Sequence, residues 1–194
     1  MDTTTQKIID ELGAAAEEHD AAQADRLDRW RVLEPDAGRL LWFLTQALPA
    51  RTIVEVGTSR GVSTLWLADA ARSTGGHVLS LDIDAEAQDA ARESLRAAGL
   101  TEQVTFRTGD GGAALAELAD GAVDLLFLDA ERTEYPAWWP HPMRVLRPGG
   151  LLVADNATSH PEEIAPLRAL VAAEPAMVTI TVGVGKGELL ALRR

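Results

Sequence analysis

The stretch from Ile53 to Thr64 constrains the fold of this chain more than any other part of the sequence. It begins with the largely β-branched run Ile-Val-Glu-Val, which is typical of a buried parallel strand. Gly57 and Gly61 follow in a tight turn, and Ser63 then opens a segment with helical apolar periodicity. A strand, a glycine turn and a helix in this order point backbone N–H groups at a ligand beside the carboxyl end of the strand, where open α/β sheets bind cofactors.

The spacing of the glycines argues against two common nucleotide-binding loops and leaves an NAD-dependent dehydrogenase as the least favoured alternative. A dinucleotide-binding turn needs the pattern G-x-G-x-x-G, but Ser59 stands where the second glycine belongs. A Gly-Lys-Ser/Thr phosphate-binding loop is also absent from the sequence. The pattern E-x-G-x-x-x-G-x-S, which runs from Glu55 to Ser63, instead resembles the first motif of class I S-adenosylmethionine-dependent methyltransferases.

Glu55 lies inside the apolar strand, where a carboxylate is costly unless a cationic or hydrogen-bonding partner meets it. The ammonium and sulfonium charges of S-adenosylmethionine would supply such a partner. A nearby arginine, Arg39 or Arg51, is the structural alternative.

Composition and charge narrow the classes of partner. A chain of 194 residues with 46% hydrophobic residues predicts one domain over residues 1–194. The net charge of −12 argues against binding to nucleic acid or to an anionic membrane, since both need a basic face. The absence of cysteine excludes disulfides, thiolate metal sites and cysteine nucleophiles. No apolar stretch is long enough to span a bilayer, so a cytoplasmic location is the default expectation.

The order of elements predicts a Rossmann-like, doubly wound α/β fold. Residues 1–34 predict a helical, mostly solvated lead-in, with a dimer contact or an active-site lid as alternative roles. Strands that alternate with helices then predict a mostly parallel sheet. These strands are expected at 53–56, 77–82, 103–107, 123–128 and, after a turn at 147–150, at 151–154. Strands at 177–182 and 188–192 form an antiparallel hairpin that completes a seven-stranded sheet.

Acidic residues lie near the carboxyl ends of four predicted strands: Glu55, Asp82, Asp129 and Asp155. Four ionised groups so close would repel one another unless cations lie among them. Asp82 follows Gly57 by 25 residues, the place where an acid accepts hydrogen bonds from ribose hydroxyls in nucleotide-binding sheets. A surface loop acid is the alternative interpretation of Asp82.

Two further groups of residues are candidates for ligand binding. Asp110, in the turn that contains Gly111, would lie beside the adenine, although this turn could equally be only a helix cap. Asp129, Asp155 and Asn156 offer three oxygen ligands, a donor set suited to magnesium or calcium rather than zinc. Capping of the helices that follow is the alternative use of these three residues.

These motifs, in their order, resemble those of the cation-dependent O-methyltransferases related to catechol and caffeoyl-CoA O-methyltransferases. The resemblance covers roughly residues 35–194, and its most specific part is Asp129 combined with Asp155-Asn156. It implies that S-adenosylmethionine is held by Glu55, Gly57, Ser59, Ser63, Asp82, Asp110, Gly111 and Asp129. It also implies that Mg²⁺ is held by Asp129, Asp155 and Asn156, where it lowers the pKa of the acceptor hydroxyl and orients it.

Arg132 departs from the family pattern, which has a lysine three residues after the metal-binding aspartate. An arginine is effectively always protonated and cannot accept the proton of the acceptor. Arg132 could still stabilise a phenolate or bind an anionic group, and with Asp129 it is the candidate catalytic residue. His141 and His160 are other candidate proton acceptors, although isolated histidines are more often surface residues.

The predicted function is therefore metal-assisted O-methylation of a small aromatic acceptor by S-adenosylmethionine. Tyr135, Trp138 and Trp139, on a predicted broken helix, either wall the acceptor pocket or belong to the core. A metal-independent small-molecule methyltransferase and a non-catalytic S-adenosylmethionine-binding protein are the alternatives. Because related enzymes are commonly dimers, the resemblance also implies a homodimer.

Overall fold

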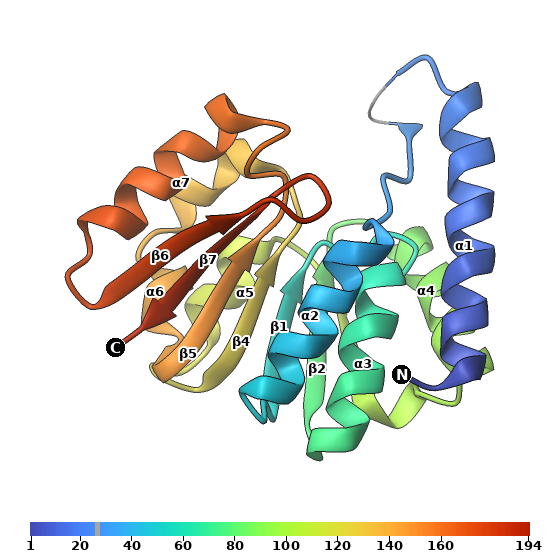
Figure 1. Cartoon of the computed structure of the whole chain (residues 1–194), viewed down its shortest axis with the longest axis horizontal. Helices are drawn as coiled ribbons and strands as arrows, with labels where there is room; N and C mark the ends of the chain where they lie inside the picture. The colour runs from blue at the N-terminus through green and yellow to red at the C-terminus, as the bar shows by residue number, and fades with distance from the viewer. Residues whose placement is uncertain (26–27) are drawn as a thin grey trace.

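The computed structural model describes residues 1–25 and 28–194 of the chain. Its strands are β1 (Thr52–Val56), β2 (His77–Asp82), β3 (Val104–Thr108), β4 (Val123–Leu128), β5 (Leu146–Ala154), β6 (Met177–Val182) and β7 (Glu188–Arg193). They form one seven-stranded sheet in the order β3-β2-β1-β4-β5-β7-β6 (Figure 1). Strands β1 to β5 pair in parallel, whereas β7 runs antiparallel to both β5 and β6. The predicted fold class, including the C-terminal hairpin, is confirmed.

Helices cover both faces of this sheet (Figure 1). They are α1 (Thr3–Ala22), α2 (Pro35–Ala47), α3 (Val62–Thr74), α4 (Ala85–Ala97), α5 (Gly111–Glu117), α6 (His141–Arg144) and α7 (Pro161–Ala173), with 3₁₀ helices η2 (Thr101–Gln103) and η3 (Arg132–Trp138). One core joins the sheet to α1, α2, α3 and α4, and a second joins it to α5, η3 and α7. Within the described ranges, no helix is long and apolar enough to cross a membrane.

Burial on both faces explains why the central strands read as continuous apolar runs. In β4, every residue except Asp124 is hydrophobic and fully buried. Side chains alternate along β1, so that Ile53 enters the core under α3 while Val54 enters the core under α5. In these central strands neither face is therefore free to bind a ligand, which leaves their ends for a ligand site.

The lead-in is helical over a shorter range than predicted. Helix α1 ends at Ala22, and the described residues between it and α2 form no α-helix, so the prediction of a helical lead-in to residue 34 was wrong at its end. Asp20 explains the change of direction, because its carboxylate accepts hydrogen bonds from the backbone N–H groups of Trp30 (2.7 Å) and Arg31 (3.0 Å). Residues 26 and 27, which the prediction included, lie outside the described residues.

The predicted turn at 147–150 was also wrong, because β5 already begins at Leu146. Val123 of β4 pairs with Leu146, whereas Leu125 pairs with Leu151, so the extra residues of β5 form a bulge. Gly149 in this bulge has a φ of +78°, a conformation that glycine adopts without strain. Residues 147–150 have the proline and glycines typical of a turn, but they form the bulged part of β5.

Candidate active site

A cavity of about 1030 Å³ opens where the parallel strands end. This volume lies at the upper end of the range for small-molecule sites. Its wall contains most of the predicted site residues: Gly57, Ser59, Asp82, Asp110, Gly111, Asp129, Arg132, Asp155 and Asn156. The fold thus brings together side chains that the sequence separates by up to 99 residues, counted from Gly57 to Asn156.

The turn after β1 requires glycine at its first position. Gly57 has a φ of +108°, and a Cβ atom there would lie only 2.1 Å from the backbone oxygen of Asp129. The backbone that follows β4 thus lies so close to the turn that position 57 has no room for a side chain. Ser59, the next residue but one, donates its backbone N–H to Asp82 at 2.8 Å. The first motif is therefore packed directly against two of the predicted acids.

Asp82 lies on the cavity wall and is half-buried. Its two carboxylate oxygens accept hydrogen bonds from the backbone N–H groups of Ser59 (2.8 Å) and Asp84 (2.9 Å). These bonds fix the orientation of the carboxylate at the end of β2, so Asp82 is not an isolated loop acid. Its contact with a ribose stays a prediction.

Asp110 is the N-cap of α5, as the alternative interpretation proposed. Its side chain accepts a hydrogen bond from the backbone N–H of Ala113 at 2.7 Å. Gly111 follows it, and a Cβ atom there would lie 2.5 Å from the side chain of Val56. Both residues line the cavity, and contact with an adenine stays a prediction for each of them.

Glu55 and Ser63 do not line the cavity. Glu55 is fully buried, and its Oε2 atom accepts hydrogen bonds from the hydroxyls of Thr64 and Ser80, each at 2.6 Å. Burial raises the pKa of Glu55 to about 7, although the nearby hydroxyls, including that of Ser63, oppose the shift. No described ion pair joins Glu55 to Arg39 or Arg51, so the arginine alternative was wrong. The role of these two residues in cofactor binding stays a prediction.

Asp129 and Asp155 follow the neighbouring strands β4 and β5 on the wall of the cavity, where their negative charges repel each other. Burial raises the pKa of Asp129 well above its ordinary value, and the charge of Asp155 raises it further. Burial also raises the pKa of Asp155, although its Oδ1 atom accepts a 2.6 Å bond from the backbone N–H of Asn156. Neither aspartate caps a helix, since Glu131 and His160 are the N-caps of η3 and α7. The capping alternative for these residues was therefore wrong.

The donor set fits a divalent cation by its chemistry. The pKa values of both carboxyls are raised, so a positive charge between them would stabilise their ionised forms. Carboxylate and amide oxygens are also the ligands that Mg²⁺ prefers. Asn156 is partly committed, because its Oδ1 atom accepts a 2.7 Å hydrogen bond from Arg132 and its Nδ2 atom donates to Asp155 at 2.8 Å. Among the described residues, no group of three or more His, Cys, Asp or Glu is arranged to hold a metal. Asp129 and Asp155 would therefore be the principal ligands.

Comparison with known proteins identifies the family. The sequence model of the O-methyltransferase family matches residues 6–191. The chain belongs to the O-methyltransferase family. This membership confirms the predicted resemblance to class I S-adenosylmethionine-dependent O-methyltransferases.

Individual relatives carry more specific names. Over 127 residues, the chain is 36% identical to a catechol O-methyltransferase of Niastella koreensis, an alignment that covers 64% of this chain and 57% of the relative. It is 34% identical over 145 residues to a catechol O-methyltransferase of Mycobacterium tuberculosis, covering 75% of this chain and 64% of the relative. The chain thus spans less than two thirds of both curated enzymes.

The fold comparison covers the chain more fully. An O-methyltransferase structure from Bacillus cereus, in complex with SAH (S-adenosylhomocysteine), matches 100% of this chain and 92% of that chain. The TM-score is 0.80 and the sequence identity is 26%.

Arg132 is the residue that the sequence analysis singled out as a departure from the expected lysine, and the structure shows what its guanidinium binds. The side chain is only 3% exposed. Its Nε and Nη2 atoms donate to Glu163 at 2.9 and 2.7 Å, and its Nη1 atom donates to Asn156. The guanidinium therefore holds the loop after β5 against α7, and its predicted contact with an acceptor stays a prediction.

Some of the aromatic and histidine residues proposed for the acceptor pocket line the cavity, and others do not. Tyr135 belongs to the core, where its hydroxyl accepts a bond from Ala130 N–H at 2.7 Å. Trp138 is also in the core but contributes to the cavity wall, whereas Trp139 is only partly buried beside that core. His160 lines the cavity, and His141 is not among the lining residues.

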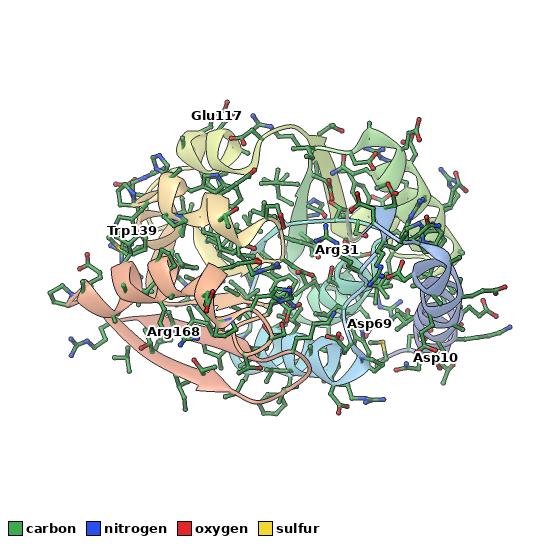
Figure 2. The ribbon with its side chains drawn as sticks, turned by 90° about the horizontal axis from the view of Figure 1, so that it is seen from above. Asp10, Arg31, Asp69, Glu117, Trp139 and Arg168 are labelled. Carbon is green, nitrogen blue, oxygen red and sulfur yellow. The ribbon has the colours of Figure 1, made fainter. Side chains whose placement is uncertain are left out.

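Sequence reasoning gave an active-site lid as an alternative role of the lead-in but named none of the lead-in residues that line the cavity. Trp30 is one of them, with its backbone oxygen accepting a 2.8 Å bond from the Ser59 hydroxyl and its ring 4.3 Å from the Arg60 guanidinium. In the view from above, Arg31 lies near the middle of the molecule, between α1 and the C-terminal hairpin (Figure 2). These contacts join residues far apart in sequence, so no local sequence motif predicts them.

Sequence reasoning also missed Glu34, Lys186 and Glu188, which lie around the two aspartates. Each one affects the pKa of Asp129 or Asp155. The sequence contains a signal for two of them. Lys186 is a charged residue in a glycine-rich loop, and Glu188, like Glu55, is an acidic residue in an apolar strand.

A test of buried Glu55 follows from its pKa. A carboxyl whose folded pKa is about 7, above an unfolded value of 4.5, binds its proton more tightly in the folded state, so stability falls as pH rises through this window. Glu55→Gln removes this loss. Denaturant unfolding at pH 5 and pH 8 should show the stability of the variant, relative to the parent, improving by about 2.5 kcal/mol at the higher pH. An unchanged difference between the two pH values would contradict this assignment.

A test of Arg132 separates support of the site from surface exposure. Arg132→Ala removes the three hydrogen bonds that the buried guanidinium donates to Glu163 and Asn156, so unfolding in urea should show a loss of about 2–4 kcal/mol. Arg39→Ala is the matched control, because Arg39 pairs with Asp36 on the exposed face of α2 and should cost less than about 1 kcal/mol. Equal small losses in both variants would place Arg132 among surface residues.

Proposed function

We propose that the protein transfers the methyl group of S-adenosylmethionine to a hydroxyl of a small aromatic acceptor, with assistance from a divalent cation. One observation carries this proposal: the glycine turn with Asp82 and the pair Asp129 and Asp155 face the same cavity. Membership of the O-methyltransferase family and the SAH bound to the Bacillus cereus structure support the methyl donor. The names of the two catechol O-methyltransferases support a phenolic acceptor.

The donor would lie along the ends of β1, β2 and β3. Gly57 lets the backbone of the turn approach the ligand, and the carboxylate of Asp82 is oriented to accept hydrogen bonds from ribose hydroxyls. Asp110 and Gly111 follow β3 on the same wall, where they would border the adenine. The chain thereby fixes the position of the methyl group relative to the acids at the ends of β4 and β5.

Activation of the acceptor is the chemical problem that these acids address. A free phenol has a pKa near 10, so only about one molecule in a thousand is ionised at neutral pH. Arg132 cannot remove the proton, because its guanidinium stays protonated. A divalent cation held by Asp129 and Asp155 would lower the pKa of the acceptor hydroxyl. The two carboxylates would also orient the acceptor toward the donor, and residues of the lead-in would exclude water from this side of the cavity.

A metal-independent methyltransferase is the second candidate, and a specific observation favours it. Asn156 Oδ1 accepts its hydrogen bond from the guanidinium of Arg132, so a positive charge already lies beside this oxygen and disfavours a second cation there. His160, on the cavity wall, would then be the group available to take the proton of the acceptor.

The requirement for metal distinguishes the two candidates. Methyl transfer to catechol should disappear in EDTA and return with Mg²⁺ or Mn²⁺, because the cation supplies the activation that Arg132 cannot. Asp155→Ala should lower turnover at least about a hundredfold without loss of SAH binding, as expected for the removal of a catalytic metal ligand. Asp89→Ala, which changes an exposed acid on α4, is the control and should retain full activity. Full activity of the parent and of Asp155→Ala in EDTA would favour the metal-independent enzyme.

A further inference from the structure

Carboxylates from four separate segments converge beside the cavity. Glu34 precedes α2, Asp129 follows β4, Asp155 follows β5, and Glu188 begins β7. Ala154 pairs with Leu189 across the two antiparallel strands, which places Asp155 and Glu188 next to each other in the register. We refer to these four residues as the carboxylate cluster.

Glu188 is the member of this cluster whose burial is energetically most costly. It is fully buried, and neither of its carboxylate oxygens meets a hydrogen-bond donor among the described residues. Its neighbour is Asp155, and burial, the charge of Asp155 and the hydrogen bond between the two side chains raise the pKa of Glu188 to about 10. Glu188 is therefore protonated at neutral pH and can donate to Asp155, so the negative charge of the cluster lies on its other members.

Lys186 supplies a positive charge to the cluster. Its ammonium group lies 2.5 Å from the Oε1 atom of Glu34, and its side chain lines the cavity beside Asp129 and Asp155. Although burial favours the neutral amine, the hydrogen bond to Glu34 and the charges of the two aspartates raise the pKa of Lys186. Arg132, which is buried near the same rim, is already committed to Glu163 and Asn156.

The backbone fixes Lys186 at this place. Its carbonyl oxygen accepts hydrogen bonds from Thr158 N–H at 3.1 Å, Ser159 N–H at 3.0 Å and the Thr158 hydroxyl at 2.6 Å. Gly187 follows with a φ of +89°, and a Cβ atom there would lie 2.3 Å from the Thr158 hydroxyl. None of these contacts uses the lysine side chain. A substitution of Lys186 should therefore change the charge in the cluster and leave the hairpin in place.

We propose that the Lys186 ammonium group is the built-in counter-ion of the carboxylate cluster, and that it competes with a divalent cation for Asp129 and Asp155. Lys186 then determines how tightly the site holds metal. This inference rests on the proposed function in one respect, since it takes these two aspartates as the metal ligands. A positive charge near them opposes the approach of a second cation and is itself displaced when the cation binds.

Calorimetric titration of Mn²⁺ into the SAH-bound protein tests this competition without a measurement of turnover. Lys186→Met removes the competing charge, so its Mn²⁺ affinity should exceed that of the parent by about tenfold or more. Lys186→Arg keeps the charge and should bind Mn²⁺ within about threefold of the parent. Lys7→Met makes the same change in net charge at an exposed pair on α1 and should leave the affinity unchanged.

The outcomes separate this inference from the proposed function. Tighter Mn²⁺ binding by Lys186→Met alone supports the inference, even if no acceptor is methylated by any of the proteins. Equal Mn²⁺ affinities in the parent and Lys186→Met overturn it, even if the parent is a metal-dependent methyltransferase. The absence of Mn²⁺ binding in all four proteins overturns it as well, and methyl transfer measured in EDTA then decides whether the metal-independent function stands.

Discussion

Burial of acidic groups at the carboxyl ends of the parallel strands is the constraint on which the rest of the site depends. Each acid meets this constraint differently. Glu55 accepts bonds from two hydroxyls, and Asp82 accepts bonds from two backbone N–H groups. Asp129 and Asp155 remain close enough for each charge to oppose the other, since burial and mutual repulsion raise the pKa of Asp129. A positive charge at this rim would therefore favour the ionised form of both aspartates.

Two cations near this rim have different partners. Arg132, which follows β4, donates to Glu163 and Asn156. Lys186, in the loop between β6 and β7, pairs with Glu34. By our proposal, Lys186 rather than Arg132 is the cation that a metal ion at Asp129 and Asp155 would displace.

The sequence predicted the features that depend on local patterns. The apolar runs predicted six of the strands to within about two residues, and Asp110 occupies the N-cap position that was its alternative role. The sequence could not predict features that depend on contacts across the fold. The loop after α1 is directed by Asp20, ten residues from Trp30, and Glu188 meets Asp155 only because β7 pairs with β5. Arg132 illustrates the same limit, because its partner Glu163 lies 31 residues away.

The central claim is that one cavity holds both the methyl donor and a cation. A crystal structure of the protein grown with SAH and saturating Mn²⁺, with diffraction data recorded at the manganese absorption edge, tests it most directly. The account predicts one anomalous peak within coordination distance of the carboxylates of both Asp129 and Asp155, and the ribose of SAH on the carboxylate of Asp82. SAH bound in the cavity with no anomalous peak between the two aspartates would contradict it.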